Sequence, residues 1–183
     1  MPRSALLDKL TSVLLYHGYA GASLANFSAE TGLSKASLYH FFPDGKHEIA
    51  RQCLARSGMK LQRLVISPLQ TGKAPVERLS ESFAGVLSYY AGPRPGCLMN
   101  LLGSVPDEPV FTSDIAAGMG AWRSALQAVL TAGGVAAERA RALTEEALEQ
   151  IQGALVMCRI NGSRAPLESR AAALNKRLAS QLR

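Results

Sequence analysis

The sequence predicts an all-α protein of about nine helices. In nearly every segment, apolar residues recur at the spacing of one helix face, and no segment shows the alternation typical of a half-buried strand. Glycine and proline clusters separate these segments, at GPRPG (92–96), PDEP (106–109) and Gly133-Gly134. The 183 residues are 48% hydrophobic, so the chain can bury a core within one large domain or two smaller ones.

The chain begins with an expected amphipathic helix. Its first residues, MPRSALLDKLTSVLLYHG, include Asp8 and Lys9 within the apolar stretch and therefore do not match a signal peptide. Gly18 is the expected end of this helix. The inward face is predicted to consist of Leu6, Leu10, Val13, Leu14 and His17.

Two short helices are expected next. Ser23 is a suitable N-cap for a helix over 24–31, and Gly32 is expected to follow it in the left-handed conformation. Ser34 is a suitable N-cap for a third, very short helix that ends before Pro43. Two short helices joined by a turn that contains glycine match a helix-turn-helix motif.

The remaining helices are longer. The segment SPLQTGKAP (67–75) is the best candidate for a linker, because it concentrates turn-forming residues. The helices around it are expected at 46–65, 76–91, 97–104, 109–132, 136–160 and 165–182.

The positive charge is unevenly distributed. The net charge is +6, and residues 1–63 contain eight Lys/Arg against four Asp/Glu, so +4 of that charge lies in the first third. This distribution favours an N-terminal module that faces nucleic acid, although any solvated basic face would give the same count.

Cysteine usage and hydropathy bear on the compartment. The three cysteines form no CxxC pair, so neither a disulfide framework nor a zinc site is indicated. No segment approaches the roughly 18 apolar residues that a membrane helix needs. We expect a cytoplasmic protein without a membrane partner, a cofactor or a metal.

A helix-turn-helix motif predicts how the third helix would meet DNA. The second helix of such a motif enters the major groove with its N-terminal residues toward the base edges. Ser34, Lys35 and Ser37 lie at that end, where free backbone amides and the positive end of the helix dipole suit phosphate.

The aromatic end of the same helix has a different expected role. Leu38 and Phe41 are expected to pack inward, and Tyr39 and His40 can direct their polar tips toward phosphates. Spacing alone equally permits Tyr39 and His40 to be ordinary residues that seal a small core.

The stretch SLANFSAETGLSKASLYHFFPDGKHEI (23–49) resembles the DNA-binding region of the TetR family of bacterial transcriptional regulators. In that family a Thr or Ser opens the second helix, a Gly-Val/Leu-Ser turn precedes a recognition helix ending in Tyr-His/Tyr-Phe, and a lysine begins the next helix. The form FPDGK is similar to a multidrug-type subgroup. The matching positions are Ser23, Gly32, Leu33, Ser34, Leu38, Tyr39, His40, Phe42 and Lys46.

The resemblance implies a DNA-binding domain over 1–46 and a ligand-binding and dimerisation domain over 47–183. The sequence departs from the family pattern at Asn26, where an acidic residue is common, and in its N-terminal arm, where Arg3 is the only basic residue. The implied contacts are Ser23, Tyr39, His40 and Lys46 with phosphates, and Lys35, Ala36 and Ser37 with base edges.

The resemblance also implies the function and the partners. We expect a repressor that binds a near-palindromic operator in double-stranded DNA as a homodimer. A small apolar or aromatic inducer is expected to release it, by favouring a conformer with a different spacing of the two recognition helices.

The larger C-terminal part has no specific motif for a ligand. Its large apolar residues, with Asn100 and Gln152 as polar anchors, fit a mostly apolar cavity, but each of them could equally be ordinary core. The candidate ligand contacts are Phe83, Leu87, Tyr90, Met99, Asn100, Phe111, Trp122, Leu126, Gln152 and Met157.

Cys97 permits a second mechanism. It follows Gly96 at an expected helix start near Arg94, and both features lower a thiol pKa, so an electrophile or oxidant sensor is one alternative. A buried, inert cysteine is the favoured interpretation.

The last two helices carry apolar stripes that could serve the chain itself or a second subunit. Family resemblance favours a four-helix bundle between two copies. The residues assigned to that interface are Leu143, Ile151, Leu155, Leu167, Leu174 and Leu178.

Catalytic motifs are incomplete in this sequence. His47-Glu48 begins like a zinc protease motif but has Arg51 in place of the second His. Ser57 to Lys60 reads S-x-x-K without its companion motifs, and Gly72-Lys73 lacks the P-loop Ser/Thr. We expect no enzyme. The main rival function is a helical small-molecule-binding module without specific DNA binding.

Overall fold

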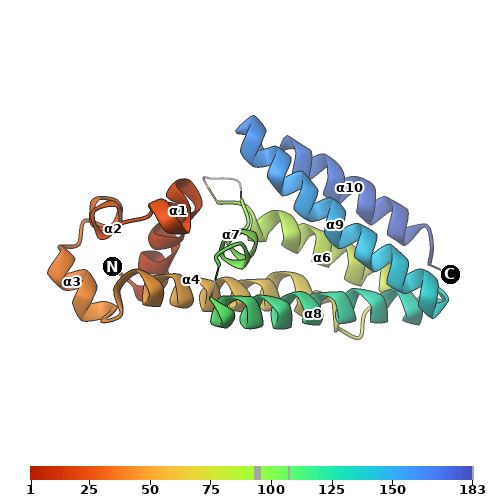
Figure 1. Cartoon of the computed structure of the whole chain (residues 1–183). Coiled ribbons are helices and arrows are strands. Elements are labelled where there is room, and N and C mark those ends of the chain that lie inside the picture. Colours follow the sequence, from red (N-terminus) through yellow and green to blue (C-terminus); the bar gives the residue numbers. More distant parts are fainter. Residues whose placement is uncertain (93–95, 107, 183) are drawn as a thin grey trace. The chain divides into compact units, whose positions relative to one another are not determined.

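The structure is a computed structural model that describes residues 1–92, 96–106 and 108–182. Every regular element in these ranges is a helix, which confirms the predicted all-α class (Figure 1). The chain divides into two compact units. The N-terminal unit contains Met1–Gly58 and Cys97–Ile115, and the C-terminal unit contains Met59–Gly96 and Ala116–Arg183.

The N-terminal unit is built on helix α1. Its backbone leaves the helical region at Gly18, where φ is 73°, so the expected break occurs there although the helix resumes briefly to Gly21. Arg56 donates two hydrogen bonds to the carboxylate of Asp8, at 3.0 and 2.8 Å, and so ties α4 to α1. His17, predicted on the inward face, is exposed, with its ring edge-on to Tyr16. The helices of this unit are α1 (Arg3–Gly21), α2 (Leu24–Thr31), α3 (Lys35–Phe41), most of α4 (Gly45–Leu61) and α7 (Leu98–Gly103), which packs on α1.

The C-terminal unit is a set of packed helices. Helices α9 and α10 run side by side, and α10 also packs on α6 (Figure 1). The expected linker 67–75 begins with the short helix α5 before its turn. The elements are η1 (Gln62–Ile66), α5 (Ser67–Leu69), α6 (Pro75–Tyr89), α8 (Pro109–Ala132, whose first turns belong to the N-terminal unit), α9 (Ala137–Asn161) and α10 (Ala165–Ala179).

The π-helical turn η1, at the end of α4, was not predicted. It meets α6 at very close range: Ser82 Oγ donates to Val65 O at 2.8 Å, and a Cβ on Gly85 would lie 1.7 Å from Leu64 O. Only glycine fits at position 85 without a backbone shift.

The two units do not coincide with the expected domains. The boundary expected after residue 46 falls inside α4, whereas the N-terminal unit continues to Gly58 and takes in Cys97–Ile115. The functional boundary at 46/47 stays a prediction. Across the described ranges, no helix combines the length and apolarity needed to cross a bilayer.

Candidate nucleic-acid interface

Helix α2 begins with a reciprocal cap. The Ser23 hydroxyl accepts a hydrogen bond from the Asn26 amide at 3.3 Å, and Asn26 Oδ1 accepts one from the Ser23 amide at 2.9 Å. Asn26 therefore performs the capping role of the acidic residue that is common at this position. Ser23 itself is exposed, as a phosphate contact requires.

The turn between α2 and α3 is held by hydroxyl groups of α2. Gly32 adopts the predicted left-handed conformation, with φ of 74°. Ser28 Oγ donates to Leu33 O at 2.6 Å, and Thr31 Oγ1 donates to Phe27 O at 2.7 Å. These bonds fix the direction in which α3 leaves the turn.

The core beneath the motif differs from the prediction in one aromatic residue. Phe41, expected to pack inward, is 41% exposed, and Phe42 is fully buried instead, with Phe27 and Leu38. Helix α3 ends at Phe41, and Phe42 follows with an extended φ of −139°. This change of backbone direction places the Phe42 side chain, rather than that of Phe41, in the core.

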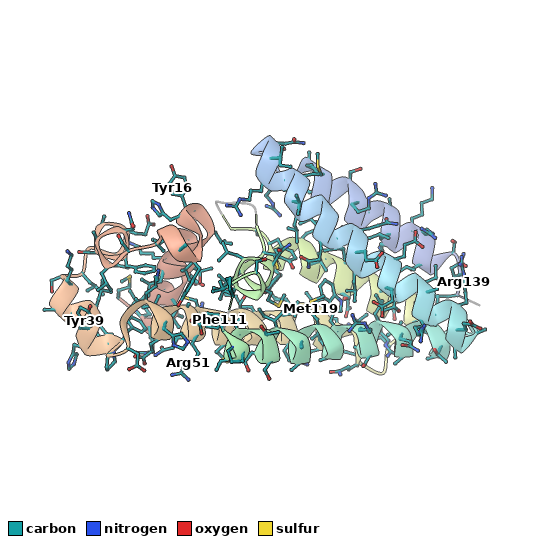
Figure 2. The ribbon with its side chains drawn as sticks, in the orientation of Figure 1. Tyr16, Tyr39, Arg51, Phe111, Met119 and Arg139 are labelled. Atoms are coloured by element: carbon teal, nitrogen blue, oxygen red, sulfur yellow. The ribbon has the colours of Figure 1, made fainter. Side chains whose placement is uncertain are left out.

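Helix α3 presents a continuous outward face. Lys35, Ala36, Tyr39 and His40 are all exposed, and Tyr39, 51% exposed, extends from the helix in Figure 2. Ser37 is half-buried; its amide donates to Ser34 Oγ at 3.0 Å, and the two hydroxyl oxygens lie 2.9 Å apart. Ser34 and Ser37 thus form the cap of the helix, and Lys35, Ala36, Tyr39 and His40 form its exposed outward face.

Tyr39 lies beside Gly45, the glycine of the FPDGK form. Gly45 begins α4 with φ of 62°, and a Cβ there would lie 3.6 Å from Tyr39 Cε1. Glu48 Oε2 accepts the Asp44 amide at 3.1 Å and so secures the start of α4 beneath the tyrosine. The positive φ explains why a glycine stands at this position of the FPDGK form.

Lys46 and Arg3 have different surroundings. The Lys46 ammonium lies 4.7 Å from the centre of the Tyr19 ring and donates to Ala20 O at 3.4 Å. Arg3 donates to Gln52 Oε1 at 2.6 Å, which holds the N-terminal residues against α4. Lys46 therefore stays close to the motif, while the side chain of Arg3 is engaged within the unit.

Comparisons with known proteins agree with this geometry. Residues 93–173 match a TetR C-terminal domain family, described as that of LmrA/YxaF-like transcriptional regulators. Over 170 residues the chain is 26% identical to the HTH-type transcriptional regulator YxaF of Bacillus subtilis strain 168, covering 90% of this chain and 88% of YxaF. It is 28% identical over 175 residues to the HTH-type transcriptional repressor DhaR of Mycobacterium sp. strain GP1, covering 91% and 86%.

The solved structure of a TetR-family transcriptional regulator from Agrobacterium tumefaciens superposes with a TM-score of 0.76 at 23% identity, covering 97% of this chain and 98% of that chain. Residues 93–173 thus match a TetR C-terminal domain family, and over most of its length the chain is similar to HTH-type transcriptional regulators. TetR-family proteins are ligand-responsive DNA-binding regulators of transcription.

The candidate effector contacts of this chain fall into three groups. Met99, Asn100 and Phe111 belong to the N-terminal unit, and Asn100 is exposed there. Met157 is 46% exposed on α9, so it is not an interior residue. The remaining candidates share the C-terminal unit, buried or half-buried: Phe83, Leu87, Tyr90, Trp122, Leu126 and Gln152.

Two polar atoms of α9 are buried without a hydrogen-bond partner among the residues that the structure describes. They are Oε1 of the predicted Gln152 and Oγ1 of Thr144, which the sequence analysis missed. Positions 144 and 152 are eight apart, so both side chains lie on one face of the helix. Each such atom lowers the stability of the fold by about 1–3 kcal/mol unless it gains a hydrogen-bond partner.

The predicted dimer residues are corrected by the structure. Leu143, Ile151, Leu155, Leu167, Leu174 and Leu178 are each at most 2% exposed in the single chain. These side chains pack α9 and α10 against each other and against the rest of the C-terminal unit. A second copy therefore cannot reach them. The accessible apolar residues of α9 are instead Val156, Met157 and Ile160, which are 47%, 46% and 69% exposed.

The three cysteines are all buried. Cys97 is 7% exposed, one residue before the six-residue helix α7. Burial raises the pKa of Cys53 to about 12, because the thiolate loses its hydration. The position of Arg94 lies outside the described residues.

Proposed function

We propose that this TetR-family regulator is a homodimeric repressor that binds a near-palindromic operator and leaves it when a small apolar or aromatic molecule binds to the C-terminal unit. The observation that carries the proposal is the outward face of α3, where exposed Lys35, Ala36, Tyr39 and His40 lie together at the end of a well-capped helix-turn-helix.

The residues of this face have distinct proposed roles. Lys35, the first residue of α3, suits the O6 and N7 acceptors of guanine, and the methyl group of Ala36 suits the methyl group of thymine. Tyr39, His40 and Lys46, with Ser23, are proposed to contact phosphates and so to set the register of the helix on the duplex. Ser34 and Ser37 act mainly through the cap that orients Lys35.

The proposed dimer uses the exposed face of α9 together with α10. Val156, Met157 and Ile160 are spaced so that they share a face, and α10 lies alongside α9. Two copies joined there form a four-helix contact with a two-fold axis. Binding to a near-palindromic operator would require the two recognition helices to lie about 34–36 Å apart, in successive major grooves.

The proposed effector is neutral, largely apolar and equipped with a hydrogen-bond donor. Phe83, Trp122 and Leu126 give the C-terminal unit a buried apolar and aromatic interior, and Gln152 Oε1 and Thr144 Oγ1 offer buried acceptors. A ligand that binds one conformer more tightly shifts the population toward it and away from the DNA-binding conformer.

The test is the affinity of the purified protein for the DNA beside its own gene, compared with random DNA at several salt concentrations. A repressor keeps its preference for the operator where nonspecific binding has been lost through counterion release. Equal affinity for the two DNAs at every salt concentration would favour the rival function, a helical small-molecule-binding module.

A further inference from the structure

Five residues of the N-terminal unit form a cluster that includes Lys46, the residue proposed to contact a backbone phosphate. We call it the Glu108 cluster: Tyr19, Lys46, His47, Glu108 and Phe111. His47 Nε2 and Glu108 Oε2 are 3.1 Å apart. Burial and the negative charge of the same carboxylate together raise the pKa of Tyr19, so its phenol stays protonated beside Glu108.

Phe111 holds the same two rings through packing. The His47 ring stacks on Phe111 at 5.3 Å with an interplanar angle of 23°, and the Tyr19 ring meets it edge-on at 5.6 Å. Phe111, marked in Figure 2 near the start of α8, is fully buried. Glu108 directly precedes α8, and Phe111 lies within the first turn of that helix. One short segment therefore contacts His47 and Tyr19 both through the Glu108 carboxylate and through the Phe111 ring.

Lys46 is next to both Tyr19 and His47. Its ammonium lies over the Tyr19 ring and on Ala20 O, and its backbone is adjacent to His47. An ammonium group has three donors, so at least one remains for a phosphate while the others hold this position.

We propose that Glu108 is a positioning residue for DNA binding: through Tyr19 and His47 it keeps Lys46 aimed at a backbone phosphate. This inference rests on the proposed function and adds a route for its regulation. Helix α8 begins in the N-terminal unit and continues from Ala116 within the C-terminal unit. An effector that displaces α8 would therefore draw Glu108 and Phe111 away from the rings and leave Lys46 unsupported.

The proposal opposes what simple electrostatics predicts. A carboxylate beside a DNA-facing lysine repels phosphate, so its removal should strengthen binding if charge alone matters. If Glu108 positions Lys46, its removal weakens binding. Glu30, an exposed residue of α2 in the same unit, provides a matched control for the lost charge.

The experiment compares the full-length variants Glu108→Gln, Glu30→Gln and Lys46→Ala by fluorescence anisotropy on operator DNA at about 50 to 200 mM salt. We expect Glu30→Gln to bind as tightly as the wild type or more tightly, and Glu108→Gln to bind about tenfold more weakly. The slope of log K against log salt should fall by about 1.8 for a dimer that loses two phosphate contacts, in both Glu108→Gln and Lys46→Ala. The double variant that combines Glu108→Gln with Lys46→Ala should bind DNA no more weakly than Lys46→Ala alone.

A purely structural role for Glu108 gives a different result. Circular dichroism melts would then show a lower midpoint while the salt slope and the affinity of the folded protein match those of Glu30→Gln, and the proposal would be overturned. If Glu108→Gln does not fold, His47→Phe carries the test, because it keeps the stack on Phe111 and loses the contact with the carboxylate. An unchanged salt slope in that variant also overturns the proposal.

The two proposals fail in different ways. If the wild type does not prefer operator over random DNA, the repressor function fails. The salt slope on random DNA still reports phosphate contacts, so a smaller slope in Glu108→Gln supports the positioning role, and an unchanged one refutes it.

Discussion

The contact between η1 and α6 predicts that Gly85→Ala is strongly destabilising. A Cβ at position 85 would lie 1.7 Å from Leu64 O and 2.6 Å from Leu64 C. Both are backbone atoms, so no side-chain rotation relieves the overlap. The two elements must separate by about 1.5 Å to restore a normal contact, an overpacking strain that typically costs about 1–3 kcal/mol.

The same separation breaks a buried hydrogen bond. Ser82 Oγ and Val65 O, now 2.8 Å apart, would leave bonding range, and both groups are buried. An unsatisfied buried polar group costs about 1–3 kcal/mol, so the total loss in the free energy of unfolding is about 2–6 kcal/mol.

The measurement is equilibrium denaturation followed by circular dichroism, at one protein concentration because a dimer's stability depends on it. Gly58→Ala in α4 is the matched control: a Cβ there meets nothing within 4 Å, so it should stabilise by about 0.5–1 kcal/mol. The reasoning is refuted if Gly85→Ala is as stable as the wild type.

Three further predictions concern the dimer, the DNA contacts and the thiols. Ile160→Glu should leave the chain folded but monomeric by light scattering, because this exposed side chain lies on the proposed interface; an unchanged dimer mass would exclude that face. Lys35→Ala should change the preference between bases by about 1–3 kcal/mol of binding free energy per base contact. Lys46→Ala should weaken binding to all DNA sequences alike, and binding-site selection would distinguish the two effects. Cys97 should react with a thiol reagent only slowly before unfolding, because it is buried; fast stoichiometric labelling of the native protein, with loss of DNA binding, would instead support the sensor mechanism.

The sequence by itself determined the fold class and most helix ends. These features depend on residues close together in the chain. Ser23 and Ser34 cap the helices that they were predicted to cap, and Gly32 takes the left-handed conformation expected of it. Spacing alone left the position of Tyr39 open, and the structure places it with Lys35 on the exposed face of α3, while Leu38 is buried.

Only the tertiary structure decided which neighbour each side chain meets. The stripe that contains Leu155 and Leu174 could have packed within the chain or against a second copy, since both outcomes need the same apolar spacing, and the structure places it inside. Glu108 and His47 are 61 positions apart, so no local pattern connects them. The role of Gly85 likewise arises from a backbone carbonyl about twenty residues away, because the approach of two helices is set by the packing of the whole unit.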